Sequence, residues 1–401
     1  MTKEKIINFC DKVIEICLYV LLAAVTFSTS IVEIGASTMI VFWSVRKLLK
    51  KDFKLVDSVP ARILGVYLLW VILSCFNSEY AEESFRGIMK WLEYSMIFIV
   101  IATTVWKEEV IRRFMYVTAG TVIVVCSNGF YQYFTGEGLI RHRQLTNLDY
   151  MRRILSSFVH PNDYAAYLIV VTVIFIAFLI AANQRLRNRL AMMGLIVVSS
   201  VSLSLTRSRG AWLAFVAAFL SLGSLRSRKI VLIFIALLLA VFVLLSQSTK
   251  DRFYALTDLQ EGTAWERVML WKGTANMIKV HPVLGMGVNT FSRNFPKYKP
   301  PEYPDSRYTH NSYLQMASEI GIVGALIFLA FLAAVLFYSL RGLASMSGGQ
   351  RKNLTVGVFA GIVGLILNCA VDTHLYSVNL AVFFHLLLGF CFSISCNAQK
   401  N

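Results

Sequence analysis

The amino-acid sequence predicts an all-α, polytopic integral membrane protein with about twelve transmembrane helices and one large polar loop. Composition is the first reason: of the 401 residues, 57% are hydrophobic and only 15% are charged, whereas soluble domains usually carry about 25% charged residues. The mean hydropathy of +0.61 is the second reason. The third is that apolar runs long enough to cross about 30 Å of hydrocarbon recur along the whole chain.

These apolar runs mark the predicted helices in chain order. They lie near residues 12–29, 31–48, 61–77, 87–105, 110–133, 163–182, 190–206, 210–224, 229–247, 312–340, 353–371 and 377–396. Glycine and polar residues in 87–105 and 210–224 indicate that these two helices are buried inside the bundle. We therefore expect a single membrane domain over residues 1–401, with a polar loop at 248–311 inserted between the ninth and tenth helices. Loops of this length are usually functional.

The distribution of charge predicts the orientation of the helices. In a soluble protein the net charge of +16 would favour nucleic acid as a partner. Here the basic residues are spread over short loops between apolar runs, so we expect no nucleic acid to bind. Those in alternate loops are Arg46, Lys47, Lys50, Lys51, Lys107, Arg112, Arg113, Arg185, Arg187, Arg189, Arg226, Arg228, Lys229, Arg341, Arg351 and Lys352. Because basic loops stay in the cytoplasm, we expect both termini to be cytoplasmic and the loop at 248–311 to lie outside.

Several arginines fall on the predicted outer side, where this rule predicts few cations. They are Arg141, Arg143, Arg152, Arg153, Arg207, Arg209, Arg252, Arg267, Arg293 and Arg307. One interpretation is that they are surface charges or interfacial anchors. The other is that the outer face binds an anion, which we favour because these residues concentrate next to predicted helix starts.

Three predicted helices begin on the outer side beside a cation or an imidazole. Arg209 opens one of them, the pair His310–Asn311 opens another, and a capping box at 263–266 starts a helix of about 18 residues. That helix carries Arg267 and Trp271 on one face. Helix N-termini and arginine side chains both favour phosphate or pyrophosphate. A surface charge at Arg267 and a hydrogen-bonded interface residue at His310 are the simpler alternatives.

The remaining ionisable residues narrow the chemistry less. Glu319 lies about two turns into its predicted helix, and because a charge at that depth is costly we expect an inward-facing arginine as its partner. Asp372 and His374, at an outer helix end, have no role that the sequence decides. No Asp-x-Asp, His-Glu-x-x-His or P-loop pattern occurs in the sequence. We therefore expect neither a metal nor another cofactor.

Four ordered motifs resemble those of the O-antigen ligase and polymerase superfamily. They are Arg207-Ser-Arg-Gly-Ala-Trp212, Arg267-x-x-x-Trp271, His281-Pro-Val-Leu-Gly-Met-Gly-Val-Asn-Thr-Phe291 and His310-Asn-Ser-Tyr-Leu-Gln-x-x-x-Glu-x-Gly-x-x-Gly324. Phe158-Val-His-Pro-Asn162 is similar to the Pro-Asn-rimmed span of the same superfamily. Each motif alone is weak, and it is the ordered set over residues 158–324 that is specific.

This resemblance implies a GT-C-like membrane glycosyltransferase that acts among membrane lipids without a metal and with inversion. Its donor would be a glycan on undecaprenyl pyrophosphate, its acceptor a lipid A–core sugar hydroxyl, and its site the periplasmic side of the bacterial inner membrane. Carried over by position, Arg209, Arg267 and His310 would be catalytic: the arginines would hold the pyrophosphate, and the imidazole would orient or deprotonate the acceptor hydroxyl. The expected substrate-binding residues are Arg207, Asn311, Trp271, Arg143, Arg153 and Glu319.

Other functions stay open beside the ligase. O-antigen polymerases and protein O-oligosaccharyltransferases share the same motifs. A transporter or flippase for lipid-linked saccharides is the alternative from a different class. It predicts movement of the substrate without bond formation, and it leaves the outer-facing His310 without a task.

Overall fold

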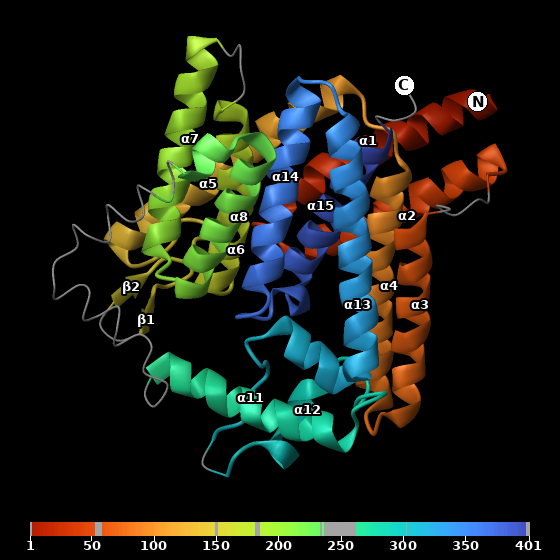
Figure 1. Ribbon diagram of the computed structural model, residues 1–401, viewed down its shortest axis with the longest axis vertical. Coiled ribbons are helices and arrows are strands. Elements are labelled where there is room, and N and C mark those ends of the chain that lie inside the picture. Colours follow the sequence, from red (N-terminus) through yellow and green to blue (C-terminus); the bar gives the residue numbers. More distant parts are fainter. Residues whose placement is uncertain are drawn as a thin grey trace.

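The computed structural model describes residues 2–52, 58–148, 151–180, 185–232, 235, 262–301 and 303–397, and these are almost entirely helical (Figure 1). The helices are α1 (Lys3–Ala24), α2 (Thr29–Lys50), α3 (Val59–Ser74), η1 (Cys75–Asn77), α4 (Ala81–Thr103), α5 (Glu108–Thr135), α6 (Pro161–Leu179), α7 (Leu186–Leu205), α8 (Arg209–Arg226), α11 (Gly262–Val280), α12 (Phe291–Tyr298), α13 (Ser312–Ser345), α14 (Gln350–Asn368), η2 (His374–Tyr376) and α15 (Val378–Asn397). The predicted all-α class is confirmed. The described exception is a short antiparallel ribbon of β1 (Thr146–Leu148) and β2 (Met151–Arg153).

Within the described ranges, six segments are long and apolar enough to cross a membrane. They are Val59–Asn77, Glu108–Thr135, Pro161–Leu179, Leu186–Leu205, Ser312–Ser345 and Val378–Cys396. A polytopic membrane protein is therefore supported. Helices α1, α2, α4, α8 and α14 occupy other predicted spans, and most of the predicted span at 229–247 lies outside the described residues. The count of twelve stays a prediction.

Helices α6 and α15 lie at the centre of the bundle. Of their most apolar stretches, 78% and 89% are buried, against 17% in α7. Helix α6 is apolar on all sides, which is typical of a helix enclosed by other helices. Helix α14 packs against both α6 and α8, and α15 packs against α4 and α13. Figure 1 shows α14 and α15 between the remaining helices.

The two helices predicted to be enclosed by the bundle are each buried on one face only, so this expectation is corrected. On α8, Ala211, Ala214 and Ala218 are buried while Leu213 is 72% exposed. These small side chains let α8 approach α14 closely, as is common between membrane helices. On α4, Trp91 is buried while Phe85 is 61% exposed. The polar and glycine residues of such helices mark a close helix contact rather than complete enclosure.

Helices α11 and α12 form a layer across one end of the bundle, and both chain termini lie at the other end (Figure 1). The helix predicted to start at the 263–266 capping box is confirmed, because α11 spans Gly262–Val280. This layer has its own small apolar core, in which Phe291 and Phe295 of α12 pack with Leu270 and Met277 of α11. The described part of the predicted loop is thus a folded cap on the bundle.

A break in α13 fastens this cap to the bundle. At Gly321 the chain adopts φ 75° and ψ 167°, outside the helical region. The neighbouring carbonyls then accept hydrogen bonds from the loop after α11: Met286 N donates to Ser318 O at 3.1 Å, and Gly287 N donates to Glu319 O at 2.8 Å. A Cβ atom on Gly321 would lie 1.8 Å from the carbonyl oxygen of Val283. Two of the sequence motifs therefore contain glycine because their backbones touch.

Candidate active site

His310 stands at the start of α13, in a tightly fixed turn. Its φ of 51° lies in the left-handed region, which is uncommon for a non-glycine residue and recurs at functional sites. The side chain of Asn311 caps the helix, with Oδ1 accepting hydrogen bonds from Tyr313 N and Leu314 N at 3.0 Å each. The turn therefore holds a half-exposed imidazole (44% of the side chain) at a helix N-terminus.

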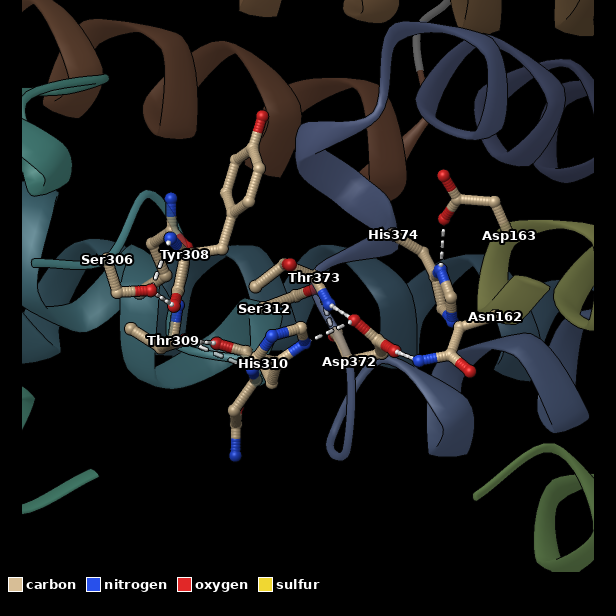
Figure 2. A network of polar contacts seen from close by, with 12 residues as sticks. Asn162, Asp163, Ser306, Tyr308, Thr309, His310, Ser312, Asp372, Thr373 and His374 are labelled. Atoms are coloured by element: carbon tan, nitrogen blue, oxygen red, sulfur yellow. Dashed lines mark hydrogen bonds and ion pairs between the residues drawn. The ribbon is translucent and has the colours of Figure 1, made fainter. Parts of the chain in front are cut away.

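The imidazole of His310 pairs with Asp372, in the segment between α14 and η2. The distance from Nδ1 to Oδ1 is 3.1 Å. The same oxygen accepts a hydrogen bond from Thr373 N at 2.8 Å, and Oδ2 accepts one from Asn162 Nδ2 at 2.5 Å (Figure 2). Burial alone would raise the pKa of Asp372, but the hydrogen bonds from His310 and Thr373 N, together with the positive charge that a protonated His374 carries, hold it well below its usual range. Asp372 is thus a carboxylate, and a carboxylate at Nδ1 leaves the lone pair of a neutral imidazole on Nε2.

Arg153 extends this network to the β-ribbon. Its Nη2 donates to Asn162 Oδ1 at 2.8 Å, and its Nε donates to the carbonyl of Thr206 at 2.9 Å. The order Arg153, Asn162, Asp372, His310 therefore forms one continuous chain of hydrogen bonds. Arg153 lies in β2, Asn162 lies in α6, His310 lies just before α13 and Asp372 lies just after α14.

Two further arginines act on this network through their charge. Burial lowers the pKa of Arg153, the carboxylate of Asp372 raises it, and the positive charges of Arg267 and Arg209 lower it. Arg209 is the first residue of α8, and Arg267 lies near the start of α11. The fold therefore brings the guanidinium groups of Arg153, Arg209 and Arg267, from separate elements, close enough to act on one another electrostatically. Such a group of cations suits a phosphate or pyrophosphate.

A second histidine–carboxylate pair lies next to the first. His374 Nδ1 is 3.0 Å from Asp163 Oδ1, and the His374 side chain is only 1% exposed. Burial lowers the pKa of His374, but the hydrogen bond to Asp163 and the charges of Asp372 and Asp163 outweigh burial and raise it. Figure 2 shows this pair on the far side of Asp372 from His310.

Helix α11 is connected directly to the turn that carries His310. The indole Nε1 of Trp271 donates a hydrogen bond to the carbonyl of Thr309 at 3.2 Å. Thr309 in turn donates through Oγ1 to the carbonyl of Asn311 at 2.6 Å. Trp271, which we expect to bind substrate, therefore holds the turn that carries His310; its contact with substrate stays a prediction.

Residues 194–329 match the family described as O-antigen ligase. Over this segment the chain is similar to the O-antigen ligase family. The resemblance seen in the motifs is thereby confirmed. The matched segment covers about a third of the chain and contains Arg209, Arg267 and His310, while Arg153 and Asp372 lie on either side of it. No curated protein matches the chain.

Two of the residues that we expect to bind substrate, Arg143 and Arg207, have no described contact with this network. The described contacts of Arg143 are local: its carbonyl accepts from Gln132 Nε2 at 2.7 Å, and burial together with the charge of Arg141 lowers the pKa of its guanidinium. Arg207 adopts φ 55° in the turn before α8, and no described contact joins its side chain to His310. A role in binding substrate stays a prediction for both.

The expectation for Glu319 is corrected. It was expected to pair with an inward-facing arginine, but its carboxylate accepts hydrogen bonds from Asn289 N at 2.7 Å and from Phe291 N at 3.3 Å. The residue is 1% exposed. Because its oxygens bond to backbone groups at the start of α12, Glu319 fastens the cap to α13, and we do not propose contact with substrate.

The sequence did not single out Asn162, Asp163, Asp372 or His374 as candidate site residues. Asn162 belonged to one of the motifs, but nothing local indicated its bond to Asp372, which is 210 residues away. Asp372 and His374 lie at a helix end that the sequence predicts to be outer, and this was the available signal. Only the packing of α14 against α6 brings the two regions together.

Proposed function

We propose that this chain is an O-antigen ligase that transfers a glycan from undecaprenyl pyrophosphate to a sugar hydroxyl of lipid A–core. The reaction would take place on the periplasmic side of the bacterial inner membrane, with both termini in the cytoplasm. The observation that carries the proposal is the His310–Asp372 pair, with Arg153, Arg209 and Arg267 acting on one another beside it. Glycosyl transfer from a pyrophosphate needs a base for the acceptor hydroxyl and cations for the leaving group, and this arrangement offers both.

His310 is the proposed general base. Nε2 takes the proton of the acceptor hydroxyl while that oxygen attacks the anomeric carbon of the donor, and the bond from this carbon to the pyrophosphate oxygen breaks. Attack opposite the departing group inverts the anomeric centre. Asp372 orients the ring through Nδ1 and stabilises the imidazolium that forms. General base catalysis of this kind typically contributes roughly two to four orders of magnitude in rate.

The arginines are the proposed partners of the leaving group. Charge develops on the pyrophosphate as its bond to the sugar breaks, and preorganised cations stabilise that charge most where water is excluded. Arg153 is held by Asn162 and Thr206, so its guanidinium needs little reorganisation. Arg209 and Arg267 supply the remaining charge, and each can offer the two parallel N–H groups that a phosphate accepts. We propose that no metal takes part.

Reconstitution of the full chain in proteoliposomes tests this proposal. Undecaprenyl-pyrophosphate glycan is supplied with either lipid A–core or a second lipid-linked glycan as acceptor, and transfer is followed by gel shift. Transfer to lipid A–core that survives excess EDTA supports the ligase. Elongation of the lipid-linked glycan alone would indicate a polymerase, and movement across the bilayer without a new bond would indicate a transporter.

The matched variants for this assay are His310→Ala and His142→Ala. Both residues have a positive φ, and His142 is an exposed residue paired with Glu137 outside the network. His310→Ala should lose roughly two to four orders of magnitude in turnover while still binding donor. His142→Ala should keep its activity. A His310→Ala variant with normal turnover would remove the general base from the proposal.

A further inference from the structure

A second series of hydrogen bonds reaches the turn that carries His310, and the proposed reaction does not use it. It begins at Glu319 of α13, where Oε1 accepts a hydrogen bond at 3.4 Å from Nε2 of Gln315, one helical turn earlier. Gln315 Oε1 in turn accepts one from Thr309 N at 3.3 Å. Because Thr309 immediately precedes His310, the side chain of Gln315 joins a buried carboxylate to the backbone beside the proposed base.

The members of this series are enclosed by protein. Glu319 is 1% exposed, Gln315 is 2% exposed and Thr309 is 0% exposed. Both hydrogen bonds are at the long end for an N–H donor and an oxygen acceptor, but water cannot replace a partner in an enclosed pair. A buried amide is costly unless its polar atoms are paired, and here Nε2 of Gln315 donates while Oε1 accepts. The position therefore suits glutamine for its two opposite hydrogen-bonding groups.

The backbone at both ends of the series is left-handed. His310 has φ 51°, and Asn289, in the loop before α12, has φ 63°. The N–H of Asn289 donates to the other oxygen of Glu319, Oε2, at 2.7 Å. Residues other than glycine persist in this region only where their surroundings hold them. Glu319 therefore anchors one strained residue directly and is linked to the other through Gln315.

Thr309 is the residue on which the contacts of the turn converge. Its carbonyl accepts a hydrogen bond from Trp271 Nε1 at 3.2 Å. Its Oγ1 donates to the carbonyl of Asn311 at 2.6 Å and accepts from Asn311 N at 3.0 Å. Gln315 binds the remaining polar group, the N–H. Of these described contacts, the one from Gln315 links the turn to the interior of α13.

We propose that Gln315 is a positioning residue, which links the turn of His310 to Glu319 and, through Glu319, to the cap. It touches no substrate. By binding Thr309 N it holds the left-handed turn, and the turn sets where the imidazole of His310 lies. The effect of Gln315 on the turn needs only the contacts described here, whereas its effect on glycan transfer rests on the proposed role of His310 as the base.

Residue-resolved hydrogen–deuterium exchange of the full chain in nanodiscs tests the contact without a glycan. Gln315→Met keeps an unbranched side chain of similar size that cannot accept the hydrogen bond from Thr309 N. We expect the amide of Thr309 to exchange about tenfold faster in this variant, the effect of losing about one hydrogen bond. Thermal unfolding shows whether the variant retains the fold.

The matched control is Gln132→Met, which removes a second buried glutamine. Gln132 Oε1 accepts hydrogen bonds from Leu155 N and Ser156 N at 3.0 Å each. The control should accelerate exchange at those two amides and leave that of Thr309 unchanged. Unchanged exchange at Thr309 in a folded Gln315→Met variant would refute the contact. A wild-type chain in which Thr309 exchanges as fast as the exposed Arg307 would refute it without any variant.

Reconstituted transfer tests the link to catalysis. Gln315→Met should lower turnover by about a hundredfold, as expected for a small displacement of a catalytic group, and should leave KM for the donor unchanged because the arginines bind it. In the double variant Gln315→Glu/Glu319→Gln the amide and the carboxylate exchange places, so an N–H still faces an oxygen between the two side chains and an oxygen still faces Thr309 N. This variant should transfer faster than either single exchange. A double variant no faster than both would contradict the positioning role.

The two measurements separate this inference from the proposed function. If exchange behaves as expected and the wild-type chain transfers no glycan, the proposed function is wrong and the hold of Gln315 on the turn is supported. If the wild-type chain transfers glycan and Gln315→Met loosens the turn without lowering turnover, the positioning role is refuted and the proposed function stands.

Discussion

Replacing Asp372 by asparagine removes the negative charge that orients His310 and changes the shape of the site very little. The carboxylate accepts hydrogen bonds from three donors: His310 Nδ1 and Thr373 N at one oxygen, and Asn162 Nδ2 at the other. An amide offers one oxygen and one NH₂ group, so at least one donor must face another donor in either orientation. If the NH₂ group faces His310, the proton of the ring moves to Nε2 and the lone pair that serves as the base is lost.

The expected loss in turnover is about two to four orders of magnitude, the range for loss of general base catalysis. An unpaired buried donor also destabilises the fold by about 1–3 kcal/mol. Because the pKa of Asp372 is lowered on folding, its contribution to stability is present above the unfolded pKa of about 3.9. That contribution is lost as the pH falls through the lower folded value. The difference in free energy of unfolding between wild type and Asp372→Asn should therefore persist above about pH 4 and shrink below it.

Turnover is measured in proteoliposomes and stability by thermal unfolding of the same preparations. The matched control is Asp11→Asn, which removes a carboxylate of α1 that pairs with Arg46 of α2 outside the network. It should leave turnover unchanged. An Asp372→Asn variant that folds and transfers glycan at more than about a tenth of the wild-type rate would refute the role assigned to this pair.

Three further predictions use the same assays. Arg209→Ala and Arg267→Ala should each abolish transfer without loss of folded protein. Lysine at either position should restore only part of the activity, because it lacks the planar fork of two N–H groups. Full activity in the alanine variants would remove these residues from the pyrophosphate site. Gly321→Ala should destabilise the fold by more than about 2 kcal/mol, since its Cβ would lie 1.8 Å from a carbonyl oxygen, whereas Gly65→Ala, with no atom within 4 Å, should be tolerated. A reporter fused within 248–311 should lie outside the cytoplasm and one after Gln399 inside it, and the opposite readout at both would reverse the predicted orientation.

Much of the fold could be predicted from the sequence because membrane helices are recognised by their length and apolar composition. The capping box at 263–266 also predicted the start of α11 to within two residues, since a helix start depends on local hydrogen bonds. Burial within the bundle was harder to predict. The composition of α8 suggested a helix enclosed on all sides, but its small residues reflect a single close contact with α14.

For the candidate site, too, local features could be predicted from the sequence and contacts between distant segments could not. Local patterns pointed to Arg209, Arg267 and His310, because helix starts beside cations can be recognised from a few residues. Glu319 was recognised as an unusual charge, but its partners are backbone N–H groups of a distant loop, which no side-chain pattern encodes. No role for Asp372 could be predicted, for a related reason. Its hydrogen bond to His310 depends on how α13 and α14 pack at their ends, and no pattern near Asp372 in the sequence predicts that contact.

The position of Asp372 has a consequence for biosynthesis. Asp372 trails His310 by 62 residues, and the helix that precedes it, α14, must already be packed against α6 for Asn162 to reach the carboxylate. If the chain is inserted from its N-terminus onwards, His310 and the three arginines of the site are therefore inserted well before Asp372. If the arginines bind the donor and His310 is the base, as proposed, the nascent protein holds a lipid-linked donor before the last helices are inserted but lacks the oriented base that consumes it. Activity would thus begin only in a chain whose final helices have been inserted.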